Sequence, residues 1–198
     1  MGLEPDWVQL INSCIKREAS PTARFLQLAT LTELGEASCR TVVFRGWHTT
    51  PDTITTPALK VVTDNRSNKI PGLRKYPRAE ACWYFTESRK QFRLTGNVTV
   101  IDSEEGDGVL SRTRLEQWRQ MPASARTVFA CPPPGRAAED PLSEEQKEMI
   151  VESEQPVECF ALLLLKPTRV DIVDLRANDR QLSQIGANTE WTEQWLNP

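Results

Sequence analysis

Histidine is nearly absent from this 198-residue sequence, in which His48 stands alone. A single histidine excludes metal centres with several histidine ligands and leaves a histidine-based catalytic triad almost no choice of residues. The five cysteines contain no Cys-x-x-Cys pair, so neither a structural zinc site nor a disulfide framework is indicated. We therefore expect reduced thiols, no bound metal, and chemistry that depends on another group or on a cofactor.

Long apolar runs and sorting signals are also missing. The longest apolar run, Cys159 to Leu165, falls far short of the ~20 residues that cross a bilayer. Residues 1–10 include acids and lack the basic region and apolar core of a secretion signal. We expect a cytoplasmic protein with no membrane segment. Since 39% of the residues are apolar and 26% charged, one globular domain over residues 1–198 is the simplest organisation.

Glycine-rich phosphate loops are the third absence. The sequence contains no G-x-x-x-x-G-K-[ST] motif, and its clustered glycines, Gly106 and Gly108, stand in an acidic stretch without a preceding strand. A kinase, a P-loop NTPase or a Rossmann dehydrogenase is therefore not indicated.

What the sequence does contain is a series of β-rich segments separated by turn residues. The predicted strands cover residues 25–31, 39–47, 59–63, 79–86, 90–100, 157–165, 169–175 and 190–196. Short hairpin turns such as Glu33 to Glu36 separate several of them, which favours an antiparallel barrel over a parallel sheet. We predict a mainly β fold with flanking helices, arranged as a Greek-key-like barrel.

Two regions are predicted to be helical or irregular. Trp7, Leu10, Ile11, Cys14 and Ile15 recur at helical spacing, so the chain opens with an amphipathic helix. Residues 103–156 form a helical and acidic insertion that breaks near Pro122 and contains the stiff Pro132 to Gly135 stretch. From Glu139 to Glu158 this insertion carries eight acids and one lysine, which is typical of a solvated helix or a mobile segment.

Positive charge is concentrated in one half of the predicted barrel, although the net charge of the chain is only -3. The segment from Arg40 to Arg93 contains eleven basic residues but only four acidic ones, so this half of the barrel could hold an anion. Thr63, Ser67 and Lys69 directly follow a predicted strand, where hydroxyls, helix-start amides and cationic side chains together suit a phosphate. The alternative, that each charge only solvates a strand end, stays open for any single residue.

At this point the residues resemble a known family. The run Cys39 to Arg45, then Val62-Thr63 with Ser67-Asn68-Lys69, then Arg89 to Gly96, is similar to the FMN-binding half of the pyridoxamine 5'-phosphate oxidase family in order and spacing. The ending Trp191 to Pro198 is similar to that family's W-x4-L-x-P terminus. The likeness is greatest to a shorter branch, of less defined function, with a tryptophan and a P-x-P-G stretch in the middle region.

The resemblance implies an FMN-binding split β-barrel that forms a homodimer, with one FMN in each of two clefts at the subunit interface. Arg40 and Lys69 would hold the FMN phosphate, helped by Thr63 and Ser67. Asn68 stands where the oxidases carry a second phosphate-binding arginine. Backbone groups of Thr41, Val42, Val43 and Phe44 would line the flavin ring, and Gln91 would hydrogen-bond toward it. Arg45 stands where the oxidases carry a lysine near flavin and substrate.

Substrate residues match the family less well. Trp118 and Arg119 lie where the oxidases place a tyrosine and an arginine for the substrate phosphate, and Arg180 is the one candidate to replace the R-L-H-x-R run of the oxidases. Trp118 fits a helix core residue equally well. Arg45 stands in place of an oxidase lysine. These departures bear on vitamin B6 oxidation more than on FMN binding.

Three functions remain compatible with these residues. The first is an FMN-dependent oxidoreductase in which a small substrate delivers hydride to flavin N5. The second is a non-catalytic flavin-binding or storage module, and the third is an authentic pyridoxamine/pyridoxine 5'-phosphate oxidase. Nucleic-acid binding is not expected, because the pI is about 5.4 and the basic residues are not interleaved with stacking aromatics.

Overall fold

An antiparallel sheet of eight strands forms most of the protein. The computed structural model describes residues 5–50, 56–105, 108–137, 142–186 and 190–198. Within these ranges the strands are β1 (Phe25–Leu31), β2 (Ala37–His48), β3 (Ala58–Asp64), β4 (Arg78–Phe85), β5 (Lys90–Ile101), β6 (Phe160–Asp174), β7 (Asp179–Ile185) and β8 (Trp191–Leu196). Their order in the sheet is β3-β2-β1-β4-β5-β6-β7-β8.

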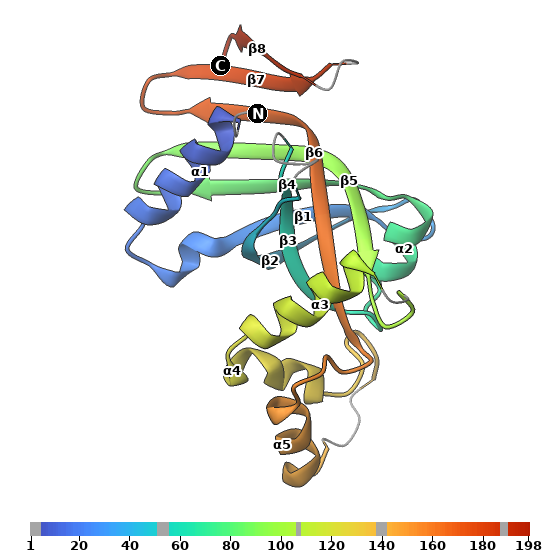
Figure 1. Ribbon diagram of the computed structural model, residues 1–198. Coiled ribbons are helices and arrows are strands. Elements are labelled where there is room, and N and C mark those ends of the chain that lie inside the picture. The colour runs from blue at the N-terminus through green and yellow to red at the C-terminus, as the bar shows by residue number, and fades with distance from the viewer. Residues whose placement is uncertain (1–4, 51–55, 106–107, 138–141, 187–189) are drawn as a thin grey trace.

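Six of these strands close into a barrel. Besides its pairing with β2, β3 pairs with the first part of β6, from Leu59 opposite Leu165 to Asp64 opposite Phe160. Strands β7 and β8 extend the sheet beyond β6 as a separate hairpin, at the top of Figure 1. The predicted fold class, a mainly β antiparallel split barrel with flanking helices, is confirmed.

Alternation of apolar residues explains how the barrel core forms. In β1, Leu26 and Leu28 are buried while Phe25 and Gln27 point outward, and in β4 Trp83 and Phe85 are fully buried. The helix α1 (Asp6–Arg17) buries Trp7, Val8, Ile11 and Cys14 against the barrel. Its Trp7 makes edge-to-face contacts with the rings of Trp47 and Trp191, so α1 joins β2 to β8.

Strand β6 corrects one expectation. The sequence predicts two strands, 157–165 and 169–175, separated at Lys166-Pro167, but the structure forms one strand of 15 residues. The register with β5 shifts between Thr95 and Gly96, and Pro167 lies opposite Gly96 at this bulge. Proline is tolerated there because a bulge interrupts the hydrogen bonds between the strands. The absence of a backbone N–H on proline therefore costs no hydrogen bond at this position.

The insertion forms a small helical unit below the barrel (Figure 1). It contains α3 (Val109–Gln120), α4 (Ala123–Arg126), the 3₁₀ helix η3 (Thr127–Ala130) and α5 (Glu144–Glu152). Trp118, Met121 and Phe129 pack with Phe160 of β6 as a separate apolar cluster. Part of the predicted acidic stretch is thus the helix α5, capped by Ser143, whereas residues 138–141 lie outside the described ranges.

The shorter elements complete the chain. They are the 3₁₀ helix η1 (Pro21–Arg24) before β1 and α2 (Lys69–Lys75) after β3. No helix within the described residues is long and apolar enough to cross a membrane.

Candidate functional site

A cavity of about 440 Å³ lies where β2 and the end of β3 meet the insertion. Its residues come from three parts of the chain that are far apart in sequence. They are Arg40, Thr41, Val42, Val43 and Arg45 of β2; Val62, Thr63, Asp64, Ser67 and Lys69 around the end of β3; and Ala125, Val128, Phe129, Cys131, Pro132 and Pro134 of the insertion. Its volume falls within the range of small-molecule and cofactor sites.

Lys69 provides a half-buried positive charge at one side of this cavity. Its Nζ donates to the Thr63 hydroxyl and to the Ser67 hydroxyl, each at 2.7 Å. Burial lowers the pKa of Lys69 to about 8, the charge of Arg40 acts in the same direction, and Asp64 opposes them. A bound anion would offset this desolvation and stabilise the charged ammonium.

Arg40 adds a second cation that no carboxylate neutralises within the described residues. Its guanidinium donates to the Leu28 carbonyl at 2.9 Å, to the Thr30 hydroxyl at 2.7 Å and to the Ser38 hydroxyl at 2.6 Å. All three acceptors are uncharged, and burial lowers the pKa of Arg40. The side chain is therefore held in place while its positive charge stays available to an anion.

Arg45 is the third cation of the lining. Burial lowers its pKa, and the nearby Arg24 adds to the effect. Its buried Nε has no hydrogen-bond partner among the described residues. A buried donor without an acceptor is costly, so this atom marks a place where a ligand oxygen or nitrogen would be favoured.

Apolar side chains form the rest of the cavity. Val42, Val43 and Val62 line it from the barrel, and Val128, Phe129, Pro132 and Pro134 line it from the insertion. The site thus joins a cationic, hydroxyl-bearing part to apolar walls. That combination suits a phosphorylated molecule that carries a flat, largely apolar ring.

Eight of the eleven predicted cofactor residues lie together in this lining: Arg40, Thr41, Val42, Val43, Arg45, Thr63, Ser67 and Lys69. The other three do not. Phe44 is buried in the barrel core, where its ring lies 5.0 Å from those of Trp47 and Trp83. Asn68 precedes α2 and packs beside Gly135, and Gln91 lies on β5 outside the lining.

The predicted substrate residues are not brought to the cavity within one chain. Trp118 is fully buried, and its Nε1 donates to the Ser153 carbonyl at 2.7 Å. Arg119 pairs with Glu154 at 3.6 Å on the insertion. Arg180 is on β7, where it donates to the nearly buried Asp171 carboxylate at 2.7 Å and 2.9 Å.

The wall formed by the insertion was not among the predicted site residues. Its members, from Ala125 to Pro134, are ordinary apolar residues, and no motif in the sequence marks them as site-forming. The P-x-P-G stretch was the one available signal, since its restricted backbone suits a fixed wall. Val62 and Asp64 were missed as well, although both directly flank the predicted Thr63.

The residues present fit FMN. Lys69, Arg40, Ser67 and Thr63 supply charge-assisted and neutral donors for a phosphate, the valines and prolines supply a flat apolar surface, and the Arg45 Nε lacks an acceptor. In the described ranges no group of three or more His, Cys, Asp or Glu side chains is placed to hold a metal ion.

A split barrel whose loop after β3 presents a lysine and two hydroxyls beside an apolar cavity has the features that an FMN-binding flavoprotein needs. Residues 4–102 match the family described as pyridoxamine 5'-phosphate oxidase, FMN-binding domain. The chain is also 34% identical over 197 residues to pyridoxine/pyridoxamine 5'-phosphate oxidase 2 of Arabidopsis thaliana, covering 97% of this chain and 96% of that protein. The chain therefore belongs to the pyridoxamine 5'-phosphate oxidase-related family, and its cofactor is FMN, as predicted.

Solved structures agree with this assignment. A pyridoxamine 5'-phosphate oxidase-related, FMN binding protein from Nostoc punctiforme superimposes with a TM-score of 0.88 at 35% identity, with all of both chains covered. PhzG from Burkholderia lata, solved with tetrahydrophenazine-1-carboxylic acid, gives a TM-score of 0.70 at 16% identity, over 100% of this chain and 94% of that one. The second likeness supports the fold alone.

Proposed function

We propose that this protein is an FMN-dependent oxidoreductase in which a small substrate delivers hydride to flavin N5. The observation that carries the proposal is the cavity itself. Its lining combines cationic side chains, the hydroxyls of Thr63 and Ser67, and apolar residues from both the barrel and the insertion. When bound, the flavin supplies the redox chemistry, because no protein side chain accepts a hydride. The chain supplies binding, orientation and the exclusion of water.

The roles of individual residues follow from their positions. Arg40 and Lys69 hold the phosphate, with Ser67 and Thr63 keeping the Lys69 ammonium in place. Val43, on the outer face of the barrel, packs against the ring system, and Arg45 offers its unpartnered Nε to a polar atom of the cofactor or substrate. Trp118 acts indirectly, since its ring packs on Phe129, which lines the cavity.

We also propose that a homodimer completes the site. Phe25 lies opposite Val43 in the sheet, and both belong to the outer face of the barrel. Tyr84 and Gln91 pair on that same outer face, where Phe25 and Tyr84 are each 44% exposed. An exposed aromatic surface that continues from the cavity lining suits a second copy of the chain, which would present its Gln91 to the cofactor.

Arg180 shares this outer face, because Val173 lies opposite both Gln91 and Arg180. In a dimer Arg180 would therefore approach the partner's cavity and contact the substrate. The proposed assembly is a cytoplasmic homodimer of single-domain chains, residues 1–198, with the insertion as part of that domain.

Two other functions are the alternatives. The relative from Arabidopsis thaliana is named a pyridoxine/pyridoxamine 5'-phosphate oxidase, so these vitamers are the first substrates to examine. A storage module would bind FMN without turnover.

Anaerobic reduction separates the three functions. The FMN-loaded protein is mixed with pyridoxamine 5'-phosphate, pyridoxine 5'-phosphate, NADH or NADPH, and loss of flavin absorbance is followed. Reduction by a vitamer identifies an authentic oxidase, and reduction by a nicotinamide identifies another oxidoreductase. FMN that stays oxidised with all four compounds would favour the storage module over the proposed function.

A further inference from the structure

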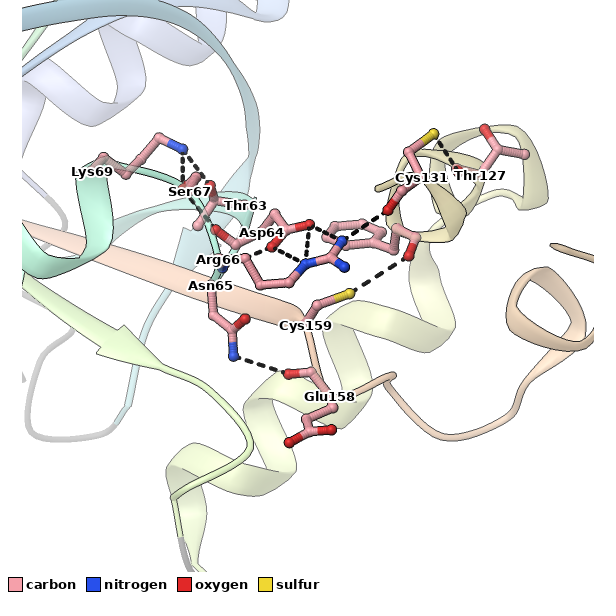
Figure 2. A network of polar contacts seen from close by, with 11 residues as sticks. Thr63, Asp64, Asn65, Arg66, Ser67, Lys69, Thr127, Cys131, Glu158 and Cys159 are labelled. Atoms are coloured by element: carbon pink, nitrogen blue, oxygen red, sulfur yellow. Dashed lines mark hydrogen bonds and ion pairs between the residues drawn. The ribbon is translucent and has the colours of Figure 1, made fainter. Parts of the chain in front are cut away.

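The segment from Thr63 to Lys69 has two sides with different contacts. One side faces the cavity and carries the phosphate-binding groups, Thr63, Ser67 and Lys69. The other side contacts the insertion through Arg66 and the segment just before β6 through Asn65, as Figure 2 shows. A single loop of seven residues therefore contacts both the expected phosphate position and the opposite wall of the cavity.

Arg66 makes the central contact between the loop and that wall. Its Nε and one terminal nitrogen form a two-point ion pair with Asp64, with distances of 3.0 Å and 2.6 Å for the shortest contacts. The same terminal nitrogen donates to the Cys131 carbonyl at 3.0 Å. The hydrogen bond that Arg66 donates to the Asp64 carboxylate raises the pKa of Arg66, so the guanidinium stays charged while it contacts both the loop and the wall.

Asp64 connects Arg66 to the phosphate-binding groups. Its carbonyl accepts a hydrogen bond from the Ser67 hydroxyl at 2.7 Å, and Ser67 in turn accepts one from Lys69. Its carboxylate also accepts from the Arg66 backbone amide at 2.8 Å. The loop geometry that places Lys69 is thus the same geometry that aims Arg66 at Cys131.

Neighbouring residues of the loop make further contacts on both sides of Arg66. The Asn65 backbone amide donates to the Cys159 carbonyl at 2.8 Å, and the Asn65 side chain donates to the Glu158 carbonyl at 3.1 Å, both in the segment that leads from the insertion into β6. Asn68 packs so closely on the turn at Gly135 that a Cβ there would come within 3.1 Å of its amide nitrogen. Of these contacts, only that of Arg66 reaches the segment Cys131 to Pro134 directly.

We propose that Arg66 is a positioning residue that holds Cys131, Pro132 and Pro134 as the outer wall of the FMN cavity and thereby slows release of the cofactor. The contact is needed because the wall has little support of its own. Prolines 132–134 donate no backbone hydrogen bonds. A second cavity of about 580 Å³ is lined by Arg66 together with Cys131 and Pro132, and the last two also line the first cavity, so the wall separates two hollow spaces.

The proposal rests on FMN occupying the cavity as proposed above, and its test does not require turnover. The measured quantity is the rate at which bound FMN exchanges with isotopically labelled FMN in excess. Quenching of the bound flavin's fluorescence by iodide measures how well the wall excludes solvent. Wild-type protein that holds no FMN would reveal a failure of the proposed cofactor site itself, before any variant is compared.

Three variants make the comparison. Arg66→Ala removes both contacts, and we expect FMN exchange to become about tenfold faster and iodide quenching to increase, as for loss of one charge-assisted hydrogen bond. Arg66→Lys keeps the charge beside Asp64 but lacks the planar fork that spans carboxylate and carbonyl, so it should also exchange faster. Lys147→Ala is the matched control, since it removes the exposed ion pair with Glu144 within the same insertion.

The outcomes are distinct. Faster exchange and stronger quenching in the Arg66 variants, with Lys147→Ala unchanged, support the proposal. Exchange at the wild-type rate in both Arg66 variants overturns it, even if their melting temperatures fall, because a purely structural role would lower stability without releasing FMN. If Arg66→Ala does not fold, Arg66→Lys alone decides by the same criterion.

Discussion

Lys69 and Arg40 place two positive charges on one cavity, and the second perturbs the titration of the first. Burial lowers the pKa of Lys69 to about 8, and the Arg40 charge contributes in the same direction. Neither residue forms an ion pair with a carboxylate in the described part of the chain. At neutral pH both side chains are charged and can attract an anion. A moderate rise in pH removes the charge of Lys69 and weakens this attraction.

A pH dependence of FMN affinity follows from this arrangement. Below pH 8 the Lys69 ammonium is charged, and above it the free protein loses that charge, while bound phosphate raises the pKa again. We expect the Kd for FMN to be flat from pH 7 to 8 and then to rise by up to about tenfold per pH unit. Titration by flavin fluorescence measures it.

An arginine in place of Lys69 is the natural control for this titration. The variant Lys69→Arg keeps its charge throughout the range, so its Kd should not rise above pH 8. An equally steep rise in both proteins would assign the titration to a different group.

Removing Arg40 should weaken the phosphate contact specifically. We expect Arg40→Ala to raise the Kd for FMN by about 10- to 100-fold, the range for a hydrogen bond to a charged group. Riboflavin, which lacks the phosphate, should lose little affinity. Isothermal titration with both flavins makes the comparison, and Arg78→Ala, an exposed arginine on β4 away from the cavity, should match the wild type.

Gly96 is required at the bulge between β5 and β6. A Cβ at this position would overlap the carbonyl oxygen of Lys166, whereas a Cβ on Gly108 would meet no atom within 4 Å. We expect Gly96→Ala to lower the free energy of unfolding by about 1–3 kcal/mol or more. Urea denaturation followed by tryptophan fluorescence would show this loss, and Gly108→Ala should unfold at nearly the wild-type midpoint.

The outer sheet face gives a test of the proposed homodimer. Placing a charge on it with Tyr84→Glu should shift the protein toward monomer and weaken FMN binding, because the partner's Gln91 would be lost from the site. Light scattering after gel filtration measures the mass. Leu34→Glu changes a residue that is 84% exposed in the turn between β1 and β2, and it should leave mass and affinity unaltered. A Tyr84→Glu protein of unchanged mass would argue against this face as the interface.

Local patterns accounted for much of the barrel. The strand predicted at 25–31 matches β1 residue for residue, since its apolar side chains alternate and turn residues follow it. Lys166-Pro167 misled the prediction of β6 because proline usually ends a strand, and only the partner strand shows that a bulge accommodates it. Strand β7 was not predicted as a separate element, since polar residues fill much of it.

The candidate site also contains residues that could be predicted from the sequence and residues that could not. Residues of β2 were predicted from the resemblance to the family's FMN-binding motifs, and those of the loop after β3 also because hydroxyl and cationic side chains follow the strand directly. The wall at Cys131 could not be predicted, because its place depends on the contact of Arg66 with a carbonyl 65 residues further along the chain. Phe44 was predicted to line the flavin through its backbone; its side chain is buried in the barrel core, and Phe44 is not among the residues that line the cavity.

The pairing of β3 with β6 also sets the order in which the chain can assemble. Leu59 must meet Leu165, so the barrel cannot close until nearly the whole sequence has been synthesised. Contacts between such distant residues make folding slow, because loop entropy is lost before the contact stabilises the chain. The insertion lies within the loop between β5 and β6, and its Trp118, Met121 and Phe129 pack on Phe160, the first residue of β6, so this cluster is completed only when β6 is present.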